Sequence, residues 1–217
     1  MRNYDAVIFD LDGTLLDTSE GVCASVAHAI ETLCLEPLGQ DVLKTFIGPP
    51  IQKSFARIYN MTPEEAAGAA AIFRDTYKDK DLLRAVPYEG IVDTIKALSK
   101  AGIKTAVATY KRQDYTMRLL THFGFDKICD SICGSDAEGK LTKKDIIVNA
   151  MHSVGVTDKS RALMVGDSDN DAIGAAEIGM PFLGVTYGFG FPDSTSLDDF
   201  EPIGAASSPE DILRYVL

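Results

Sequence analysis

Two acidic residues, Asp10 and Asp12, directly follow the first short apolar run of the 217-residue chain, and Gly13 permits a sharp turn there. Carboxylates at this spacing can supply a nucleophile and an acid–base group that share a cation. The structural alternative is an aspartate–glycine turn with a helix cap, which is the more frequent role of an isolated motif of this kind. The pair therefore indicates catalysis only if further chemical groups join it.

A second acidic cluster follows a later apolar run, where Gly166 precedes the segment Asp167-Ser168-Asp169-Asn170-Asp171. Acidic side chains packed this densely beside a buried strand repel one another unless a cation lies between them. A helix N-cap explains one of these side chains and leaves the others unexplained. We therefore interpret this segment as part of a metal site.

Two further segments could contact an anion. Thr109 follows the second apolar run, where its hydroxyl could equally cap a helix or bind a ligand. Thr142 and Asp145 have the spacing of a capping box. Lys143 and Lys144 would then lie in the first turn of a helix, where the helix dipole disfavours cations. This placement indicates that a lysine is held there for an anion, with a solvated charge run as the alternative.

Short apolar runs precede most of these segments and alternate with helical patterns. Continuous hydrophobicity is typical of strands that are buried on both faces of a parallel sheet. The expected strands are Ala6–Phe9, Ile103–Ala108, Ile128–Cys133, Ala162–Val165 and Phe182–Val185. The alternation predicts an α/β fold with a doubly wound parallel sheet. Ligands bind beyond the carboxyl ends of such strands, so the candidate side chains would meet at one edge.

The long interval between the first two expected strands contains only helical patterns. Thr62-Pro63-Glu64-Glu65 is a strong helix start, and Gly48-Pro49-Pro50 must turn the chain. We therefore expect a small helical cap domain, residues 18–84, inserted into a core domain formed by residues 1–17 and 85–217. The two crossings between these domains would act as hinges.

The composition indicates a folded protein with an acidic surface, since 46% of the residues are hydrophobic and the net charge is -11. Such a surface repels nucleic acid and anionic membranes, so neither is expected as a partner. No apolar stretch approaches the ~18 residues of a membrane span. The start of the chain lacks a signal-peptide pattern, and the cysteines lack metal-ligand spacing. These features predict a cytoplasmic protein, and they carry no signal for an oligomeric state.

Together, the motifs resemble those of the haloacid dehalogenase-like hydrolase superfamily. The first family motif, a hydrophobic run followed by DxDGT, stands here as Val7–Leu15. Thr109 matches the second motif, Lys143 or Lys144 the third, and Gly166–Asp171 the fourth. The motifs occur in the family's order along essentially the whole chain. The expected helical cap is similar to the family's first cap subclass.

Two further segments, Phe46–Pro50 and Gly184–Gly190, are similar to those of the phosphoglycolate phosphatase group and its 5'-nucleotidase relatives. Many phosphoglycolate phosphatases carry the third-motif lysine in a K-P-x-P segment, which this chain lacks. The run that begins at Lys143 is closer to the K-x-D pattern of nucleotidase relatives. This register makes Lys143 the expected motif lysine, with Lys144 second.

The resemblance implies a Mg²⁺-dependent phosphomonoester hydrolase that acts on a small phosphorylated metabolite, as phosphoglycolate phosphatases do. It implies that Asp10 is a nucleophile that forms an aspartyl-phosphate, while Asp12 acts as acid and base. Thr109 and Lys143 would hold the phosphate oxygens.

The resemblance also implies a metal site and a cap contact. Mg²⁺ would be held by the Asp10 carboxylate, the Asp12 backbone carbonyl and Asp167. Asp171 would lie behind these ligands and orient water or the lysine. Gly48 and Pro49 would face the substrate from a turn of the cap.

Three alternatives stay open. The first is a 5'-nucleotidase of the same family, and the second is a β-phosphoglucomutase-like phosphomutase, which returns the phosphoryl group to a sugar. The third is a catalytically silent binding protein, although such members usually lack a nucleophile or metal carboxylate that this chain retains. Haloacid dehalogenation is disfavoured because Asp12 would have no role in it.

Overall fold

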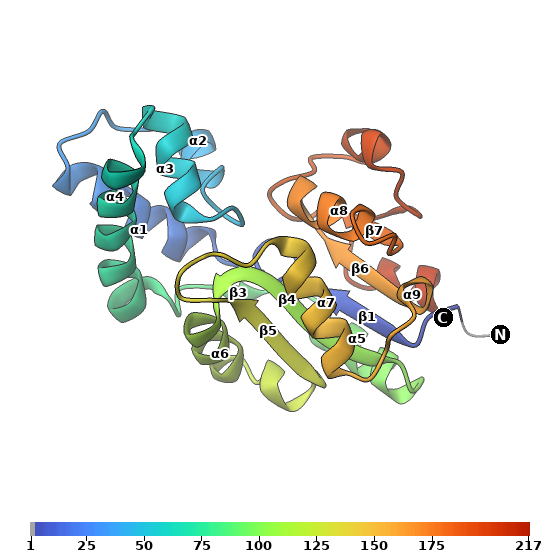
Figure 1. Cartoon of the computed structure of the whole chain (residues 1–217). Helices are drawn as coiled ribbons and strands as arrows, with labels where there is room; N and C mark the ends of the chain where they lie inside the picture. The colour runs from blue at the N-terminus through green and yellow to red at the C-terminus, as the bar shows by residue number, and fades with distance from the viewer. Residues whose placement is uncertain (1–2) are drawn as a thin grey trace. The chain divides into compact units, whose positions relative to one another are not determined.

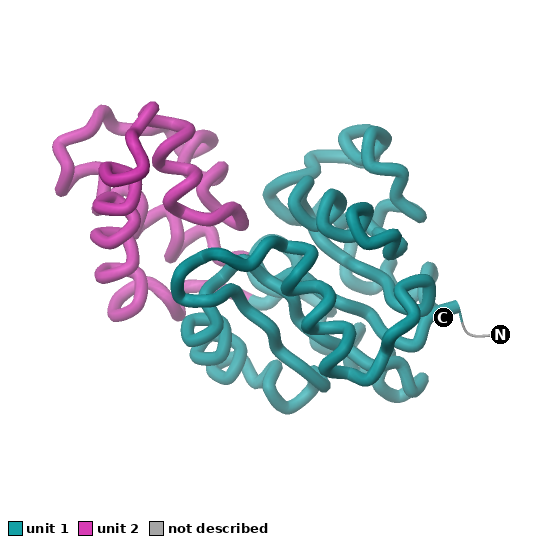
Figure 2. Tube along the Cα trace, viewed as in Figure 1, with its two compact units in different colours: residues 1–16, 87–217 teal, residues 17–86 magenta. Residues whose placement is uncertain are grey.

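The structure, a computed structural model, describes residues 3–217 and divides them into two compact units (Figures 1 and 2). The first unit contains the chain up to Leu16 together with Pro87–Leu217, and the second contains Asp17–Val86. A short two-stranded sheet of β2 (Leu16–Asp17) and β3 (Val86–Pro87) lies where the chain passes between the units. The assignment of residues 18–84 as a cap domain stays a prediction.

A six-stranded sheet of order β5-β4-β1-β6-β7-β8 forms the centre of the first unit. All its strand pairs are parallel. The strands are β1 (Ala6–Phe9), β4 (Lys104–Arg112), β5 (Ser131–Ser135), β6 (Ala162–Gly166), β7 (Phe182–Val185) and β8 (Ala205–Ala206). The register aligns Phe9 of β1 with Val107 of β4 and Val165 of β6, so the residues that follow them reach the same edge of the sheet.

Helices cover both faces of this sheet, which confirms the predicted α/β fold. Ala6 and Ile8 of β1 belong to a core cluster with residues of α7 and α8. Val7 and Phe9 point to the opposite face and are also fully buried. The helices of this unit are α5 (Ile91–Lys100), α6 (Gln113–His122), α7 (Lys143–Ser153), α8 (Asp169–Ala176) and α9 (Asp211–Val216).

The predicted strands correspond to β1, β4, β5, β6 and β7, but β4 extends to Arg112, beyond its expected end at Ala108, and the two-residue strands β2, β3 and β8 were not predicted. β5 begins at Ser131, later than expected, because a 3-10 turn (Phe125–Lys127) occupies the approach to it. β8 was not predicted because its two residues form no apolar run of their own.

The second unit is helical. Its elements are α1 (Ser19–Thr32), α2 (Gln40–Lys44), α3 (Ile51–Tyr59), α4 (Pro63–Thr76) and the π-helical turn η1 (Tyr77–Asp81). Thr62 and Glu65 form the expected capping box at the start of α4. Within residues 3–217, the structure contains no helix that is long and apolar enough to cross a membrane.

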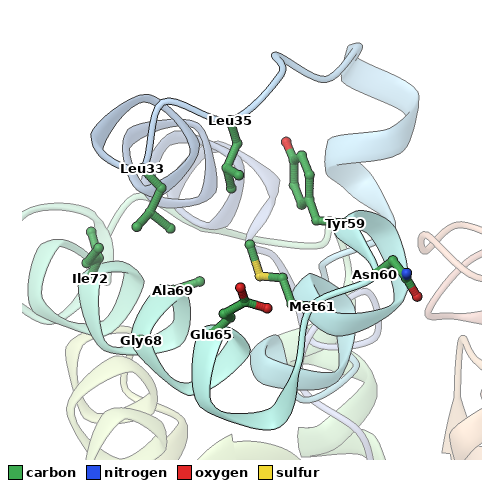
Figure 3. Close-up of a pocket in the computed structure, with 9 residues that line it drawn as sticks. All are labelled: Leu33, Leu35, Tyr59, Asn60, Met61, Glu65, Gly68, Ala69 and Ile72. Atoms are coloured by element: carbon green, nitrogen blue, oxygen red, sulfur yellow. The ribbon is translucent and has the colours of Figure 1, made fainter.

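A pocket of about 540 Å³ opens among the helices of the second unit (Figure 3). Its lining is mostly apolar and consists of Leu33, Leu35, Tyr59, Asn60, Met61, Glu65, Gly68, Ala69 and Ile72. The Glu65 carboxylate accepts the Thr62 backbone N–H at 2.9 Å and so serves the cap of α4. None of the predicted site residues lines this pocket.

Candidate active site

Three buried carboxylates converge at the carboxyl edge of the sheet. Asp10 follows β1, Asp167 follows β6, and Asp171 lies in the first turn of α8. Each offers one oxygen, and these oxygens all lie within 4.8 Å of one another. The structure thus brings together acidic residues from the two motifs that the sequence places far apart.

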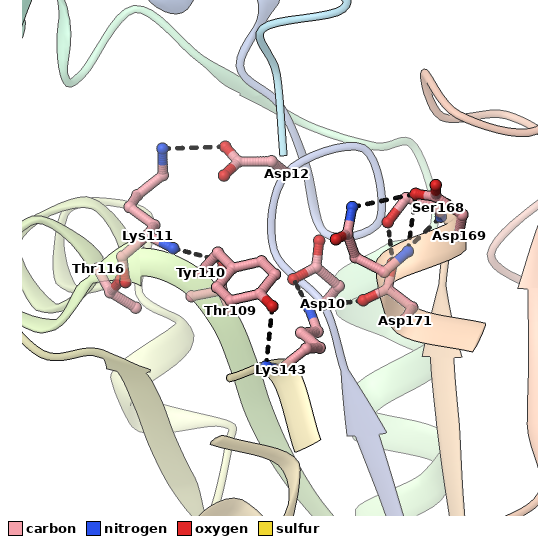
Figure 4. Close-up of polar contacts among 11 residues, drawn as sticks. Asp10, Asp12, Thr109, Tyr110, Lys111, Thr116, Lys143, Ser168, Asp169 and Asp171 are labelled. Carbon is pink, nitrogen blue, oxygen red and sulfur yellow. Dashed lines mark hydrogen bonds and ion pairs between the residues drawn. The ribbon is translucent and has the colours of Figure 1, made fainter. Parts of the chain in front are cut away.

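Lys143 contributes a positively charged ammonium group to this cluster (Figure 4). Its Nζ lies 2.6 Å from Oδ1 of Asp10 and 2.5 Å from Oδ1 of Asp171. Its backbone N–H, at the first position of α7, donates to the Tyr110 hydroxyl at 3.0 Å. Burial lowers the pKa of Lys143, but the negative charges of Asp10 and Asp171 raise it further, so the side chain stays protonated.

Lys144, the second candidate for the motif lysine, points elsewhere. Its Nζ lies 3.7 Å from the Glu177 carboxylate, and both side chains are exposed. The phase of α7 therefore brings only the first of the two neighbouring lysines to Asp10. The expected register, with Lys143 at the site, agrees with this placement.

The cluster holds more negative charge than Lys143 can balance. Burial is the main cause that raises the pKa of Asp10 to about 7; Lys143 opposes the shift, and Asp171 adds to it. Burial, followed by Asp171 and Asp10, raises the pKa of Asp167 well above its usual range. A divalent cation would favour the ionised carboxylates. Oxygen-only donors with surplus negative charge fit Mg²⁺, which prefers such ligands.

Backbone amides hold Asp167 in place. Its Oδ2 accepts the N–H groups of Phe189 at 2.7 Å and Gly190 at 3.2 Å. A Cβ atom on Gly188 would lie 2.4 Å from both the Gly13 carbonyl oxygen and the Asp167 Cβ, so this loop needs glycine to approach. The sequence resemblance includes this loop, but its contact with Asp167 depends on tertiary structure and was not foreseen.

The Asp12 side chain does not join the carboxylate cluster. Its Oδ1 lies 3.1 Å from Nζ of Lys111, and the two side chains point toward each other (Figure 4). Thr109 is buried in β4, and its Oγ1 accepts the Lys111 backbone N–H at 3.2 Å. The role of the Asp12 backbone carbonyl as a metal ligand stays a prediction.

Asp171 makes two kinds of contact. Its Oδ1 pairs with Lys143, while its Oδ2 accepts the backbone N–H and the hydroxyl of Ser168 at 3.1 and 2.7 Å. The second contact belongs to the cap of α8. Asp171 therefore contacts the lysine directly, and its role in orienting the lysine or a water molecule stays a prediction.

Sequence reasoning did not single out Tyr110 and Lys111. Both directly follow Thr109, and this adjacency was the available signal. Gly48 and Pro49 lie in the second unit between α2 and α3, where Gly48 adopts a left-handed φ of 93°. Their contact with substrate stays a prediction.

Comparisons with known proteins agree with this geometry. The profile of the haloacid dehalogenase-like hydrolases matches residues 7–185. A 5'-nucleotidase from Pseudomonas aeruginosa is 34% identical over 88% of this chain and 86% of its own. Pyrophosphatase PpaX from Halalkalibacterium halodurans is 32% identical over 98% of this chain and 96% of its own.

A solved structure resembles the whole chain. The crystal structure of a predicted phosphatase from Clostridium acetobutylicum has a TM-score of 0.91 at 35% identity, covering 98% of this chain and 97% of the other. The profile match extends over most of the chain, and both the 5'-nucleotidase and pyrophosphatase PpaX are more than 30% identical to it over at least 86% of their own length. The chain therefore belongs to the haloacid dehalogenase-like hydrolase family.

Proposed function

We propose that this chain is a Mg²⁺-dependent phosphomonoesterase that hydrolyses a small phosphorylated metabolite through an aspartyl-phosphate on Asp10. The observation that carries the proposal is the position of Asp10. Its buried carboxylate follows the central strand, contacts an ammonium group and lies beside two more carboxylates. A purely structural carboxylate would not gather this surplus of negative charge around itself.

In the first step, a carboxylate oxygen of Asp10 attacks phosphorus in line with the ester oxygen. The bond from phosphorus to the leaving oxygen breaks, and Asp12 donates its proton to that oxygen. The products are an aspartyl-phosphate on Asp10 and the free alcohol. Lys143 and Thr109 hold the equatorial phosphate oxygens and stabilise their charge.

In the second step, Asp12 accepts a proton from a water molecule, which attacks phosphorus from the side of the departed alcohol. The bond from phosphorus to Asp10 breaks, which releases phosphate and restores the nucleophile. Asp171 serves both steps as a positioning residue, because its carboxylate fixes the Lys143 ammonium at 2.5 Å.

The metal ion would be held by the carboxylates of Asp10 and Asp167 and by the Asp12 backbone carbonyl. When bound, it supplies positive charge that offsets the negative charge of the carboxylates and of the phosphoryl group. The amides of Phe189 and Gly190 keep Asp167 oriented for this role.

We assign substrate selection to the helical unit, with Gly48 and Pro49 as contacts to the substrate. Phosphoglycolate is the first candidate, because segments 46–50 and 184–190 resemble those of phosphoglycolate phosphatases. A 5'-nucleotide is the second candidate, supported by the similarity to the Pseudomonas 5'-nucleotidase.

We further propose a cytoplasmic location. The four cysteines form no disulfide in the described part of the chain, which suits a reducing compartment. Subcellular fractionation checks this assignment, and recovery in a secreted or periplasmic fraction would contradict it.

A phosphate-release assay tests the proposed activity. The panel contains phosphoglycolate, nucleoside monophosphates, sugar phosphates and pyrophosphate, each with Mg²⁺ and with EDTA. We expect release that requires Mg²⁺ and is lost in Asp10→Asn. Turnover of a sugar phosphate only in the presence of a sugar bisphosphate would indicate a phosphomutase instead. No release from any compound by folded wild-type protein would contradict the proposal.

A further inference from the structure

A second lysine lies at the catalytic edge of the sheet, and the mechanism above gives it no task. Lys111 is near the end of β4, and its Nζ lies 3.1 Å from Oδ1 of Asp12. The two side chains are only 8% and 5% exposed, so this charged pair is largely removed from solvent. Bringing a lysine into such a position costs hydration free energy, which the Asp12 carboxylate offsets and an anionic ligand would offset further.

The two lysines address different parts of a bound substrate. Lys143 contacts Asp10 and therefore faces the phosphoryl group. Lys111 contacts Asp12, the residue assigned to the leaving oxygen. A general acid lies within about 3 Å of the atom that it protonates, which places the Lys111 ammonium within roughly 6 Å of the bridging ester oxygen.

We propose that Lys111 determines specificity by binding a negative charge that the leaving group carries close to the bridging oxygen. This inference rests on the proposed function and names the substrate class of the same site. The chain has a net charge of -11 and its site is rich in carboxylates, so an anionic leaving group needs a cation beside it. Lys111 supplies this cation beside Asp12, whereas Lys143 contacts Asp10 and Asp171 and faces the phosphoryl group.

Phosphoglycolate fits this class, because one CH₂ group separates its carboxylate from the bridging oxygen. Pyrophosphate belongs to the same class, since its leaving group is itself a phosphate. Nucleosides and unmodified hexoses are neutral leaving groups and would gain nothing from the ammonium. Lys111 would thus separate two groups of substrates that present the same phosphoryl group to Asp10.

The test compares two substrates that differ in one charge, phosphoglycolate and its neutral carboxamide, phosphoglycolamide. Lys111→Met removes the ammonium and keeps most of the apolar stem. Because a charge-assisted contact is lost, we expect kcat/KM for phosphoglycolate to fall ~100-fold and that for the amide to fall less than ~3-fold. Lys104→Met is the matched control: Lys104 lies at the other end of β4, pairs with Asp130, and should leave both values unchanged.

Equal losses on the two substrates would overturn the inference, because Lys111 would then act on the reaction in general through Asp12. A wild-type protein that shows no preference for the carboxylate over the amide would overturn it as well. Pyrophosphate is assayed as a third substrate. If Lys111→Met lowers kcat/KM for pyrophosphate alone, the inference of an anionic leaving group is supported and that leaving group is a second phosphate.

A binding experiment separates failure of this inference from failure of the proposed function. Asp10→Asn protein, with and without Lys111→Met, is titrated calorimetrically with phosphoglycolate and with phosphoglycolamide. Tighter binding of the carboxylate that disappears with Lys111→Met supports the inference even if no compound is hydrolysed. Equal binding of both compounds to both proteins contradicts it.

Discussion

Each unit of the molecule buries an aspartate, and the surroundings of the two aspartates differ. Asp81 in the second unit accepts a hydrogen bond from the Ser25 hydroxyl at 2.7 Å and pairs with Arg84 at 2.9 Å. Asp10 in the first unit shares one lysine with Asp171 and also lies close to Asp167. The first arrangement satisfies its charge within the protein, whereas the second leaves negative charge for a ligand to balance. A buried carboxylate therefore indicates a functional site only when the neighbouring cations and hydrogen-bond donors do not balance its negative charge.

Asp10→Asn should give the largest effect and separates activity from stability. The amide cannot attack phosphorus, so we expect kcat to fall by at least ~10³-fold. Stability without metal should be retained or raised, because the substitution removes repulsion inside the cluster. Phosphate release and thermal unfolding measure the two effects. Activity within tenfold of wild type would exclude Asp10 as the nucleophile.

Lys143→Met should have the next largest effect. Loss of the ammonium removes charge stabilisation at the phosphoryl group, and we expect kcat/KM to fall ~10²–10³-fold. Lys144→Met is the matched control, because the neighbouring lysine is exposed and should change the rate less than ~2-fold. A larger loss in Lys144→Met than in Lys143→Met would show that Lys144 is the lysine that acts on the phosphoryl group.

Asp81→Asn tests whether the buried aspartate of the second unit has a purely structural role. The amide keeps the shape but loses the ion pair with Arg84, so we expect the free energy of unfolding to fall by about 1–3 kcal/mol. The kcat of the folded variant should match that of wild type. Chemical denaturation and phosphate release provide the two readouts. A large loss of kcat in a fully folded variant would contradict a structural role.

The pH dependence of stability should show the smallest effect. Burial, opposed by Lys143, raises the pKa of Asp10 from its usual value of 3.8 to about 7 in the folded, metal-free protein. Folding therefore takes up a proton between these values, so the contribution of Asp10 to stability is present at low pH and is lost as pH rises through 7. The raised pKa of Asp167 acts in the same direction.

Mg²⁺ should counter this loss because it competes with protons for the carboxylates. At ten times its dissociation constant, it would stabilise the folded protein by about 1.4 kcal/mol. Melting temperatures at pH 5 and pH 7, with Mg²⁺ and with EDTA, check the expectation that the stabilisation is larger at pH 7. A Mg²⁺ effect that is absent at pH 7, or that disappears as pH rises, would contradict a metal site at these carboxylates.

The strands and the helix starts could be predicted from the sequence, because each depends on residues that are close together along the chain. Apolar runs identified the buried strands, and parallel strands end at one edge, so Asp10, Thr109 and Asp167 could be expected near one another. The capping box at Thr142 fixed the start of α7 and so placed Lys143 in its first turn.

Contacts between distant segments were not predictable in the same way. The pairing of Lys111 with Asp12 depends on how far β4 extends beyond β1, which no periodicity specifies. The amides of Phe189 and Gly190 are invisible in a residue pattern because every residue except proline carries one.

Detection of the covalent intermediate tests the central claim most directly. Wild-type protein is mixed with Mg²⁺ and its preferred substrate and quenched in acid within milliseconds. Borohydride then reduces the acyl phosphate to homoserine, and peptide mass spectrometry locates the modified residue. We predict homoserine at position 10 in a substrate-dependent amount, and none at Asp12, Asp167 or Asp171. Efficient turnover with no modification at Asp10, or modification at another aspartate, would contradict the account.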